Sequence, residues 1–312
     1  MVSQKDLKIA VLTGTTASGK TGLGIEFARA HGNIEIINAD SLLVYRGMDI
    51  GTAKPTTQEL KIVPHHLIDI CDPSENFTAG DFVKKAHEAI EDIQKRGKTP
   101  LVLGGTGFYL KALILGLWDA PKTDRAVRAH IESRTVEENF QILTEKDPTT
   151  ALRIGINDHY RIVRALEIIE ISGKTPTELE SSQKTEAPYD YEVWILDRPE
   201  EELRKRIHAR SAQMIEAGLI EEVKVIREKY PESRALGSVG YRQVCSYLDG
   251  VEPEGRKIPS GIPGLLAEIE LGTRQLVKKQ RTWFRGQIDA TWFEMERDLE
   301  LIQLRFKELY LR

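Results

Sequence analysis

The sequence has 312 residues, of which 40% are hydrophobic and 29% are charged, a mixture typical of globular proteins. Its net charge of −4 argues against non-specific binding of nucleic acid over the whole surface, although a local basic face is compatible with that total. No apolar run approaches the ~18 residues of a membrane span. We expect no secretory signal, and Cys71 and Cys245 fit neither a metal site nor a disulfide framework. A cytoplasmic protein without membrane contact is therefore expected.

The first third of the chain predicts strands that alternate with helices. Apolar runs at 8–13, 34–39 and 99–103 are each followed by a glycine-rich or polar turn, and helical spacing follows the first and third turns. This alternation is typical of a parallel sheet, in which ligands bind at the carboxyl ends of the strands. The site is therefore expected where these three runs end.

The middle of the chain predicts an all-helical insertion. From 121 to 188 strand-like runs disappear, and helical stretches at 125–133 and 160–172 are joined by polar turns. A strand at 192–197 then returns the chain to the sheet. The domain boundaries that follow are residues 1–120 with 189–312 for the α/β core and 121–188 for the insertion.

Two long helical stretches are expected after this strand. Residues 199–230 predict one amphipathic helix with an apolar side. The segment 250–264 is rich in Gly and Pro and predicts a loop, after which a final helix begins near Leu265.

A phosphate-binding loop follows the first predicted strand. The stretch GTTASGKT satisfies G-x-x-x-x-G-K-[ST] and lies between a strand and a helix, as the motif requires. Its backbone N–H groups can face phosphate oxygens, Lys20 supplies a positive charge, and Thr21 can ligate Mg²⁺. The residues of this loop are Gly14, Thr15, Thr16, Ala17, Ser18, Gly19, Lys20 and Thr21. We expect a P-loop NTPase-like parallel sheet that binds a diphosphate or a nucleotide.

The P-loop leaves the reaction open, because kinases, ATPases and other transferases share it. Asp40, at the end of the second strand, can hold Mg²⁺, act as a general base, or cap a helix. Thr106 lies in a glycine turn after the third strand that either faces the same phosphates or is an ordinary connection. His65 and His66 have no further ligand at metal-binding spacing, so no metal site is expected there.

Two segments are basic within this acidic chain. Residues 272–286 contain five Lys or Arg residues, no acid, and two aromatic residues, which favours contact with a nucleic-acid backbone. The insertion carries a second cluster, made of Arg153, His159, Arg161 and Arg164. For both segments the alternative is a solvated basic helix face.

Several stretches together resemble the tRNA dimethylallyltransferase family. They run in family order from Gly14 to Arg285 and read GTTASGKT, NADSLLVYRGMDIGTAKP, PHHLIDICDP, GGTGFYLKALILGL, NDHYRIVRALEI, SGKTPTE, SVGYRQ and TRQLVKKQRTWFR. The resemblance implies transfer of a dimethylallyl group from dimethylallyl diphosphate to N6 of adenine 37, next to the anticodon, in tRNAs that read codons starting with U. The P-loop would hold the diphosphate leaving group, with Mg²⁺ bound at Thr21.

The same resemblance implies roles for single residues. Asp40 is expected to accept the N6 proton, and Thr106 and Arg242 to contact the diphosphate and its bridging oxygen. The implied tRNA-binding residues are Asp40, Ser41, Leu42, Leu43, Thr106, Arg128, Tyr160, Arg161, Ile162, Val163, Arg164, Gly237, Ser238, Val239, Gly240, Tyr241, Arg242, Lys278, Lys279, Gln280, Arg281, Thr282, Trp283, Phe284 and Arg285. The expected partner is the anticodon stem-loop, whose target adenine would leave its stack, and the protein is expected to be a monomer.

Two positions depart from the family pattern, and three other functions share parts of it. Thr15 stands where the P-loop of the family often has proline, and Arg281 stands where many members have an apolar residue. No zinc-finger extension of the eukaryotic kind is found, so a bacterial-type enzyme is expected. The alternatives are a small-molecule kinase, an isopentenyl transferase acting on free adenine nucleotides, and an RNA-binding nucleotide switch. The second has no need of two basic clusters, and the third lacks an NKxD-type motif.

Overall fold

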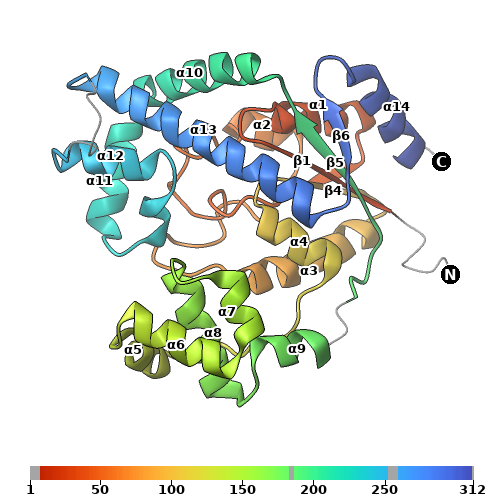
Figure 1. Ribbon diagram of the computed structural model, residues 1–312. Helices are drawn as coiled ribbons and strands as arrows, with labels where there is room; N and C mark the ends of the chain where they lie inside the picture. Colours follow the sequence, from red (N-terminus) through yellow and green to blue (C-terminus); the bar gives the residue numbers. More distant parts are fainter. Residues whose placement is uncertain (1–7, 183–185, 252–258, 311–312) are drawn as a thin grey trace. The chain divides into compact units, whose positions relative to one another are not determined.

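The structure is a computed structural model that describes residues 8–182, 186–251 and 259–310 (Figure 1). The chain divides into two compact units, of which the first comprises Met1–Ile114 with Pro188–Arg312 and the second Leu115–Ala187. The first unit contains a sheet covered by helices, and the described residues of the second are helical.

A parallel six-stranded sheet with the order β3-β2-β4-β1-β5-β6 organises the first unit. Its strands are β1 (Ile9–Gly14), β2 (Ile34–Asn38), β3 (His65–His66), β4 (Thr99–Leu103), β5 (Tyr191–Asp197) and β6 (Thr291–Glu294). β1 and β2 are buried along their whole length because helices cover both faces. The parallel sheet expected from the sequence is confirmed, and the short edge strands β3 and β6 add to it.

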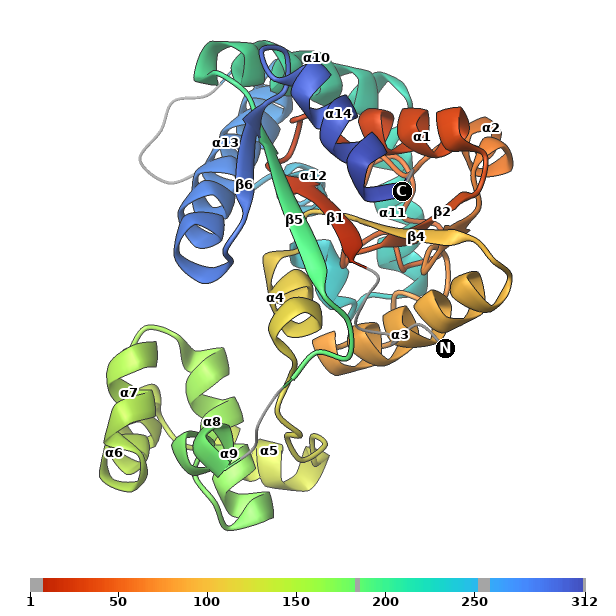
Figure 2. The same cartoon turned by 90° about the vertical axis from the view of Figure 1, so that its right-hand side faces the viewer.

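Helices pack on both faces of this sheet, as Figure 2 shows. On one face α1 (Lys20–His31) and α14 (Leu299–Tyr310) meet through Phe27 and Phe306, whose ring centroids are 4.2 Å apart. On the other face α3 (Ala79–Lys95) and α4 (Gly107–Leu115) stack Phe82 on Tyr109 at 4.6 Å. Both faces are therefore filled, and the carboxyl ends of the strands are left for a ligand.

A third apolar core joins later helices to the loop after β2. It contains Val44 and Met48 of that loop and buried residues of α11 (Leu219–Lys229), α12 (Tyr241–Leu248) and α13 (Ile262–Gln287). The shorter α2 (Thr57–Ile62) and the 3₁₀ turn η2 (Arg234–Gly237) lie in the connections. This packing fixes the loop that borders the site described below.

The single helix predicted for residues 199–230 is wrong. The structure has α10 (Glu200–Glu216) and α11, separated at Gly218, whose φ of 103° lies in the left-handed region. A glycine adopts this conformation without a Cβ clash, so the chain turns there although the apolar pattern continues on both sides.

The second unit is a bundle of short helices with a core of its own. Its helices are α5 (Arg125–Glu132), α6 (Val136–Lys146), α7 (Pro148–Ile154), α8 (His159–Ser172) and α9 (Pro176–Ser182). Asp124, Thr135, Asp147 and Asp158 cap the first four by accepting hydrogen bonds from backbone N–H groups. Ile131, Leu143 and Leu166 are fully or almost fully buried at its centre.

Candidate active site

The predicted P-loop connects β1 to α1 with a backbone that needs its glycines. Gly19 has a φ of 97°, and a Cβ on Gly14 would lie 2.2 Å from the carbonyl oxygen of Leu196. Ala17 also has a positive φ, of 66°. Because α1 begins at Lys20, the positive end of its dipole and its free N–H groups face the loop.

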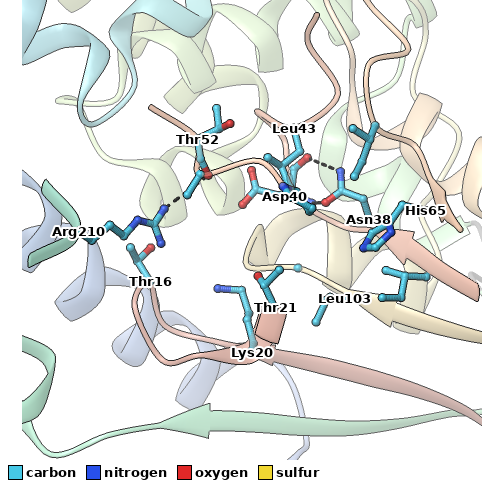
Figure 3. Close-up of a pocket in the computed structure, with 15 residues that line it drawn as sticks. Thr16, Lys20, Thr21, Asn38, Asp40, Leu43, Thr52, His65, Leu103 and Arg210 are labelled. Atoms are coloured by element: carbon cyan, nitrogen blue, oxygen red, sulfur yellow. Dashed lines mark hydrogen bonds between the residues drawn. The ribbon is translucent and has the colours of Figure 1, made fainter. Parts of the chain in front are cut away.

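An open pocket of about 570 Å³ lies between the P-loop and the ends of β2 and β4 (Figure 3). Its lining residues are Thr16, Lys20, Thr21, Ile36, Asn38, Asp40, Leu43, Thr52, Ala53, Pro55, His65, Ile68, Leu103, Gly104 and Arg210. Cations lie on the P-loop side and apolar side chains on the β2–β4 side. The pocket is thus suited to a ligand with an anionic and an apolar part.

Two cations of this pocket have no carboxylate partner within hydrogen-bonding distance in the part of the chain that the structure describes. Lys20 donates to the carbonyl of Thr15 at 3.3 Å, and Arg210 donates to the carbonyl of Thr52 at 3.5 Å. Burial lowers the pKa of Lys20 to about 8, against an opposing attraction from Asp40. Burial also lowers the pKa of Arg210. Such cations favour an anionic ligand, because it would supply the charge partner that they lack.

Asp40 is held in one conformation by the turn that follows β2. Its Oδ1 accepts a hydrogen bond from the N–H of Leu42 at 2.9 Å, and Asn38 bonds both the N–H and the carbonyl of Asp40 at 3.1 Å. The next helix, α2, begins at Thr57 with Thr56 as its cap, so Asp40 does not cap a helix. Figure 3 shows its carboxylate facing Lys20 across the pocket.

Thr106 supports the Asp40 turn from the neighbouring strand. Its hydroxyl oxygen accepts from the N–H of Ser41 at 2.9 Å and lies 3.2 Å from the Ser41 hydroxyl. Gly105, beside it, leaves room for Lys20, whose Nζ would lie 3.3 Å from an added Cβ. The predicted catalytic residues Asp40 and Thr106 therefore lie together beside the P-loop.

Arg242 is the predicted catalytic residue that the structure does not place in this pocket. It lies at the start of α12 with an exposed side chain and does not line the pocket. Its neighbour Tyr241 is fully buried against the segment around Gly51, where an added Cβ would meet the tyrosine ring at 2.5 Å. The diphosphate contact expected of Arg242 stays a prediction.

Gln280 links α13 to both phosphate-side loops. Its Oε1 accepts from the N–H of Thr16 at 2.8 Å, and its amide nitrogen donates to the carbonyl of Gly105 at 3.2 Å. Arg281, the next residue, forms a bidentate ion pair with Asp197 at 2.8 and 2.9 Å and donates to the carbonyl of Arg198. Unlike the exposed cations of α13, Arg281 is therefore engaged within the protein.

Three arginines around the P-loop were missed by sequence reasoning. Arg198 donates to the carbonyl of Ser18 at 2.8 Å, Arg206 donates to that of Ala17 at 2.9 Å, and Arg210 reaches the pocket. Arg206 and Arg210 are four residues apart on α10 and follow the apolar positions 203 and 207. That spacing is a signal for one helix face, although it does not reveal what the face meets.

The loop at 49–55 was also missed, and an acid on α11 holds it. The carboxylate of Glu222 accepts from the N–H groups of Asp49, Ile50 and Gly51 at 2.8, 2.7 and 3.0 Å. It also accepts from the hydroxyl of Tyr241 at 2.6 Å. This anchor places Thr52, Ala53 and Pro55 along the pocket.

Four residues of the expected tRNA-binding set have fully buried side chains. Ile162 and Val163 belong to the core of the helical unit, Tyr241 to the core beside α12, and Phe284 to the core on one face of the sheet. The tRNA contact of the stretches that contain them stays a prediction.

The polar members of that set in the helical unit are close together. The guanidinium of Arg128 lies 5.1 Å from the ring centroid of Tyr160 and pairs with Glu132 at 2.9 Å. Arg164 instead bonds the buried Glu167 at 2.7 Å and the carbonyl of Pro121 at 2.5 Å. Arg161 is exposed.

A family model described as IPP transferase matches residues 43–287 of this chain. The chain belongs to the IPP transferase family. The tRNA dimethylallyltransferase of Geobacter sulfurreducens is 38% identical over 304 residues, covering 95% of this chain and 94% of the relative. The tRNA dimethylallyltransferase 1 of Citrifermentans bemidjiense is 40% identical over 295 residues and 93% of each chain.

Solved structures agree with this assignment. The tRNA isopentenylpyrophosphate transferase of Bacillus halodurans is 34% identical over 97% of each chain, with a TM-score of 0.65. A eukaryotic dimethylallyltransferase described as acting on tRNA is 28% identical, with a TM-score of 0.80 over 96% of this chain and 77% of its own. The predicted family, the P-loop NTPase-like fold and the transferase class are therefore confirmed. No helix within the described ranges is long and apolar enough to cross a membrane.

Proposed function

We propose that this IPP transferase moves the dimethylallyl group of dimethylallyl diphosphate to N6 of adenine 37 in tRNAs that read codons starting with U. The observation that carries the proposal is the pair of cations, Lys20 and Arg210, which face the Asp40 carboxylate across a pocket at the P-loop. One side of this pocket suits a diphosphate, and the other can accept a proton.

The diphosphate side explains how the leaving group is stabilised. As the bond between the allylic carbon and the diphosphate oxygen breaks, negative charge grows on the diphosphate. Lys20, Arg210 and the N–H groups at the start of α1 are already oriented toward that charge. The free N6 electron pair forms the new bond to the allylic carbon, and diphosphate departs.

The Asp40 side supplies the base. An exocyclic aromatic amine is a weak nucleophile, and its proton must leave as the C–N bond forms. Oδ1 of Asp40 is anchored on the Leu42 N–H, so the carboxylate is held in place to take that proton. The apolar residues Leu43, Ala53, Pro55, Ile68 and Leu103 would surround the hydrocarbon of the donor.

The donors of the pocket fit Mg²⁺ as the cofactor of the reaction. The Thr21 hydroxyl and the Asp40 carboxylate line the same pocket, and oxygen atoms are the ligands that Mg²⁺ prefers. No cluster of three His, Cys, Asp or Glu side chains suited to a metal occurs among the described residues. Thr21, together with phosphate oxygens and water, would therefore hold the ion, which would neutralise part of the diphosphate charge.

Exposed cations support tRNA as the acceptor. Lys278, Lys279 and Arg285 lie exposed on the last turns of α13, and Arg161 and Tyr160 lie exposed on the helical unit. The exposed cations of each unit suit the phosphates of an anticodon stem-loop, which a flipped adenine would anchor in the pocket. We extend the proposal to Arg242 as a diphosphate contact, to a monomer and to a cytoplasmic location.

The deciding experiment incubates the purified protein with Mg²⁺, dimethylallyl diphosphate and unmodified tRNA, and detects prenylated adenosine by mass spectrometry after digestion. Parallel reactions use the isolated anticodon stem-loop, tRNA with guanine at position 37, and free AMP. We expect product with unmodified tRNA and with the isolated anticodon stem-loop. We expect none with tRNA that has guanine at position 37 and none with free AMP. Product on AMP would reassign the acceptor. Absence of prenylation with every RNA, together with turnover of ATP in a separate incubation with ATP, would overturn the proposal in favour of a kinase.

A further inference from the structure

A second hollow, of about 410 Å³, lies between the start of α4 and the last turns of α13. Its lining residues are Gly107, Phe108, Lys279, Gln280, Trp283 and Phe284. The two helices lie side by side in both Figure 1 and Figure 2. Sequence reasoning assigned Phe108 no role, and the reaction proposed above does not use it.

Aromatic side chains form the walls of this hollow. Phe108 is large and apolar, yet it is 60% exposed. Trp283 lies against the α4 backbone at Gly107, where an added Cβ would be 2.4 Å from the indole ring. Phe284 is fully buried beneath them. The hollow therefore presents ring surfaces to solvent, and the missing Cβ of Gly107 sets the position of one of them.

The charge around these rings favours an anionic partner. Lys279 lines the hollow, and Lys278 and Arg285 are exposed on the same end of α13. Residues 272–286 contain no acid. Flat aromatic surfaces combined with cations are the features by which proteins hold unpaired nucleotides, since the rings stack on a base and the cations meet its phosphate.

The hollow is connected to the reaction pocket by one side chain. Gln280 lines the hollow and also bonds Thr16 of the P-loop and Gly105 of the β4 turn. The hollow therefore lies beside the P-loop and the β4 turn, which border the reaction pocket. This continuity favours a single-stranded RNA segment as the occupant.

We propose that the hollow binds a second unstacked nucleobase of the tRNA loop, adjacent to the target adenine, stacked on Phe108 and Trp283 with its phosphate near Lys279. The inference rests on the proposed function, because it places a neighbour of the modified base. It assigns Phe108 a role in holding the loop open, so that the target adenine is free to enter the pocket.

The test combines protein and RNA changes in a double-mutant cycle. Wild type, Phe108→Ala and Phe108→Tyr are titrated with anticodon stem-loops that carry an abasic site at one loop position at a time, other than the target. Leu304→Ala is the matched control, since Leu304 is 53% exposed on α14, which packs on the opposite face of the sheet. Affinities are measured by fluorescence anisotropy.

We expect Phe108→Ala to bind the intact loop about tenfold more weakly, the usual scale of one base stacked on an aromatic ring. In wild type one abasic position, next to the target, should cause a similar loss. In Phe108→Ala that same abasic site should cause no further loss, whereas Phe108→Tyr and Leu304→Ala should behave as wild type. Gly107→Ala, which displaces Trp283, should reproduce the Phe108→Ala pattern.

Equal sensitivity of wild type and Phe108→Ala to every abasic position would overturn the inference. Unchanged affinity of Phe108→Ala for the intact loop would do the same. The prenylation assay separates this failure from that of the proposed function. A wild-type protein that prenylates tRNA without any coupling to Phe108 retires the stacking site alone.

Discussion

The two ends of strand β2 carry carboxylates in contrasting surroundings. Near its amino end, the buried Glu35 accepts two hydrogen bonds from Arg96 at 2.6 Å, one from Lys98 at 2.7 Å and one from His66 at 2.7 Å. Just past its carboxyl end, Asp40 faces Lys20 across a pocket without a direct ion pair. The same strand therefore joins a saturated charge cluster, in which the carboxylate is directly bonded to its cations, to an unsaturated one, in which it is not.

The difference indicates which charges stabilise the fold and which await a ligand. The hydrogen bonds from Arg96 hold the pKa of Glu35 well below its usual range. The folded protein therefore favours the ionised form of Glu35 more than the unfolded chain does, and this carboxylate stabilises the fold. Burial lowers the pKa of Lys20 instead, so the folded protein disfavours that charge until an anion arrives. Holding a buried cation such as Lys20 ready for a ligand lowers the stability of the fold. The Glu35 cluster, near the other end of β2, offsets part of that loss.

Asp40→Asn tests the unsaturated end most severely. The asparagine oxygen can still accept the hydrogen bond from the Leu42 N–H, so the turn should persist while the base is lost. We expect transfer to slow at least ~100-fold with tRNA and diphosphate affinities nearly unchanged. Single-turnover rates with saturating enzyme would measure this directly. Asp190→Asn, at an exposed carboxylate outside the pocket lining, is the matched control, and an Asp40→Asn rate near that of wild type would remove Asp40 from the chemistry.

Glu35→Gln tests the saturated end. Removing the charge leaves the two cations Arg96 and Lys98 beside a neutral amide, and because both are partly exposed we expect a loss of about 2 kcal/mol in unfolding free energy. The folded pKa of Glu35 is lowered, so its contribution is fully present above about pH 4.5 and is lost as pH falls toward the folded value. Urea unfolding at pH 7 and at pH 3.5 should show the difference shrinking at the lower pH.

The rate of prenyl transfer should respond differently from stability in Glu35→Gln. At 25 °C Glu35→Gln should leave turnover unchanged, because Glu35, His66, Arg96 and Lys98 do not line the pocket. Glu91→Gln, which breaks only an exposed pair with Lys95 at 3.6 Å, is the control and should change stability by less than ~0.5 kcal/mol. A loss of activity in Glu35→Gln without unfolding would show that the two ends of β2 are coupled.

The P-loop could be predicted from the sequence because its residues are local. Eight consecutive positions between a strand and a helix define the loop, and the site at the carboxyl ends of parallel strands follows from the sheet itself. Asp40 and Thr106 were found for the same reason. Arg198 and Arg206 were not, because their contacts with the P-loop join residues 180 and 189 positions apart in the sequence. Arg210 was not, because it reaches the pocket only through the way α10 packs.

The fold shows the same limit at shorter range. The buried strands have continuous apolar runs, whereas β3 is the two-residue pair His65–His66 and β6 is a short C-terminal segment, and both exist only through pairing with β2 and β5. Phe284 sits in a basic, aromatic stretch that predicted RNA contact, and only the packing of α13 on the sheet reveals it as core. Pattern alone does not tell which face of a helix is covered.

Arg210→Gln tests the cation side of the pocket. The variant keeps an amide in the pocket and removes a charge that has no carboxylate partner among the described residues. We expect diphosphate to bind about tenfold more weakly, the scale of one hydrogen bond to a charged group. Isothermal titration would give the affinity. Arg204→Gln is the control on the same helix, because Arg204 pairs with Glu200 on the exposed side, and equal losses in both variants would indicate a general charge effect.

The pH dependence of diphosphate binding should reveal the titration of Lys20 and so distinguish the two charge clusters of β2. With a pKa of about 8, Lys20 is charged below that pH and loses its proton as pH rises through it. Binding through the charged form should make diphosphate about threefold weaker at pH 8.5 than at pH 7.5. Lys20→Arg, which stays charged, should lack this step and so corrects for the ionisation of diphosphate itself. Calorimetry at pH 8.5 in buffers of different ionisation enthalpy should detect proton uptake by wild type and none by Lys20→Arg. Equal uptake by both proteins would mean that Lys20 is already charged before the anion binds. The contrast between the Glu35 cluster, whose charges are paired, and Lys20, whose charge lacks a partner, would then not hold.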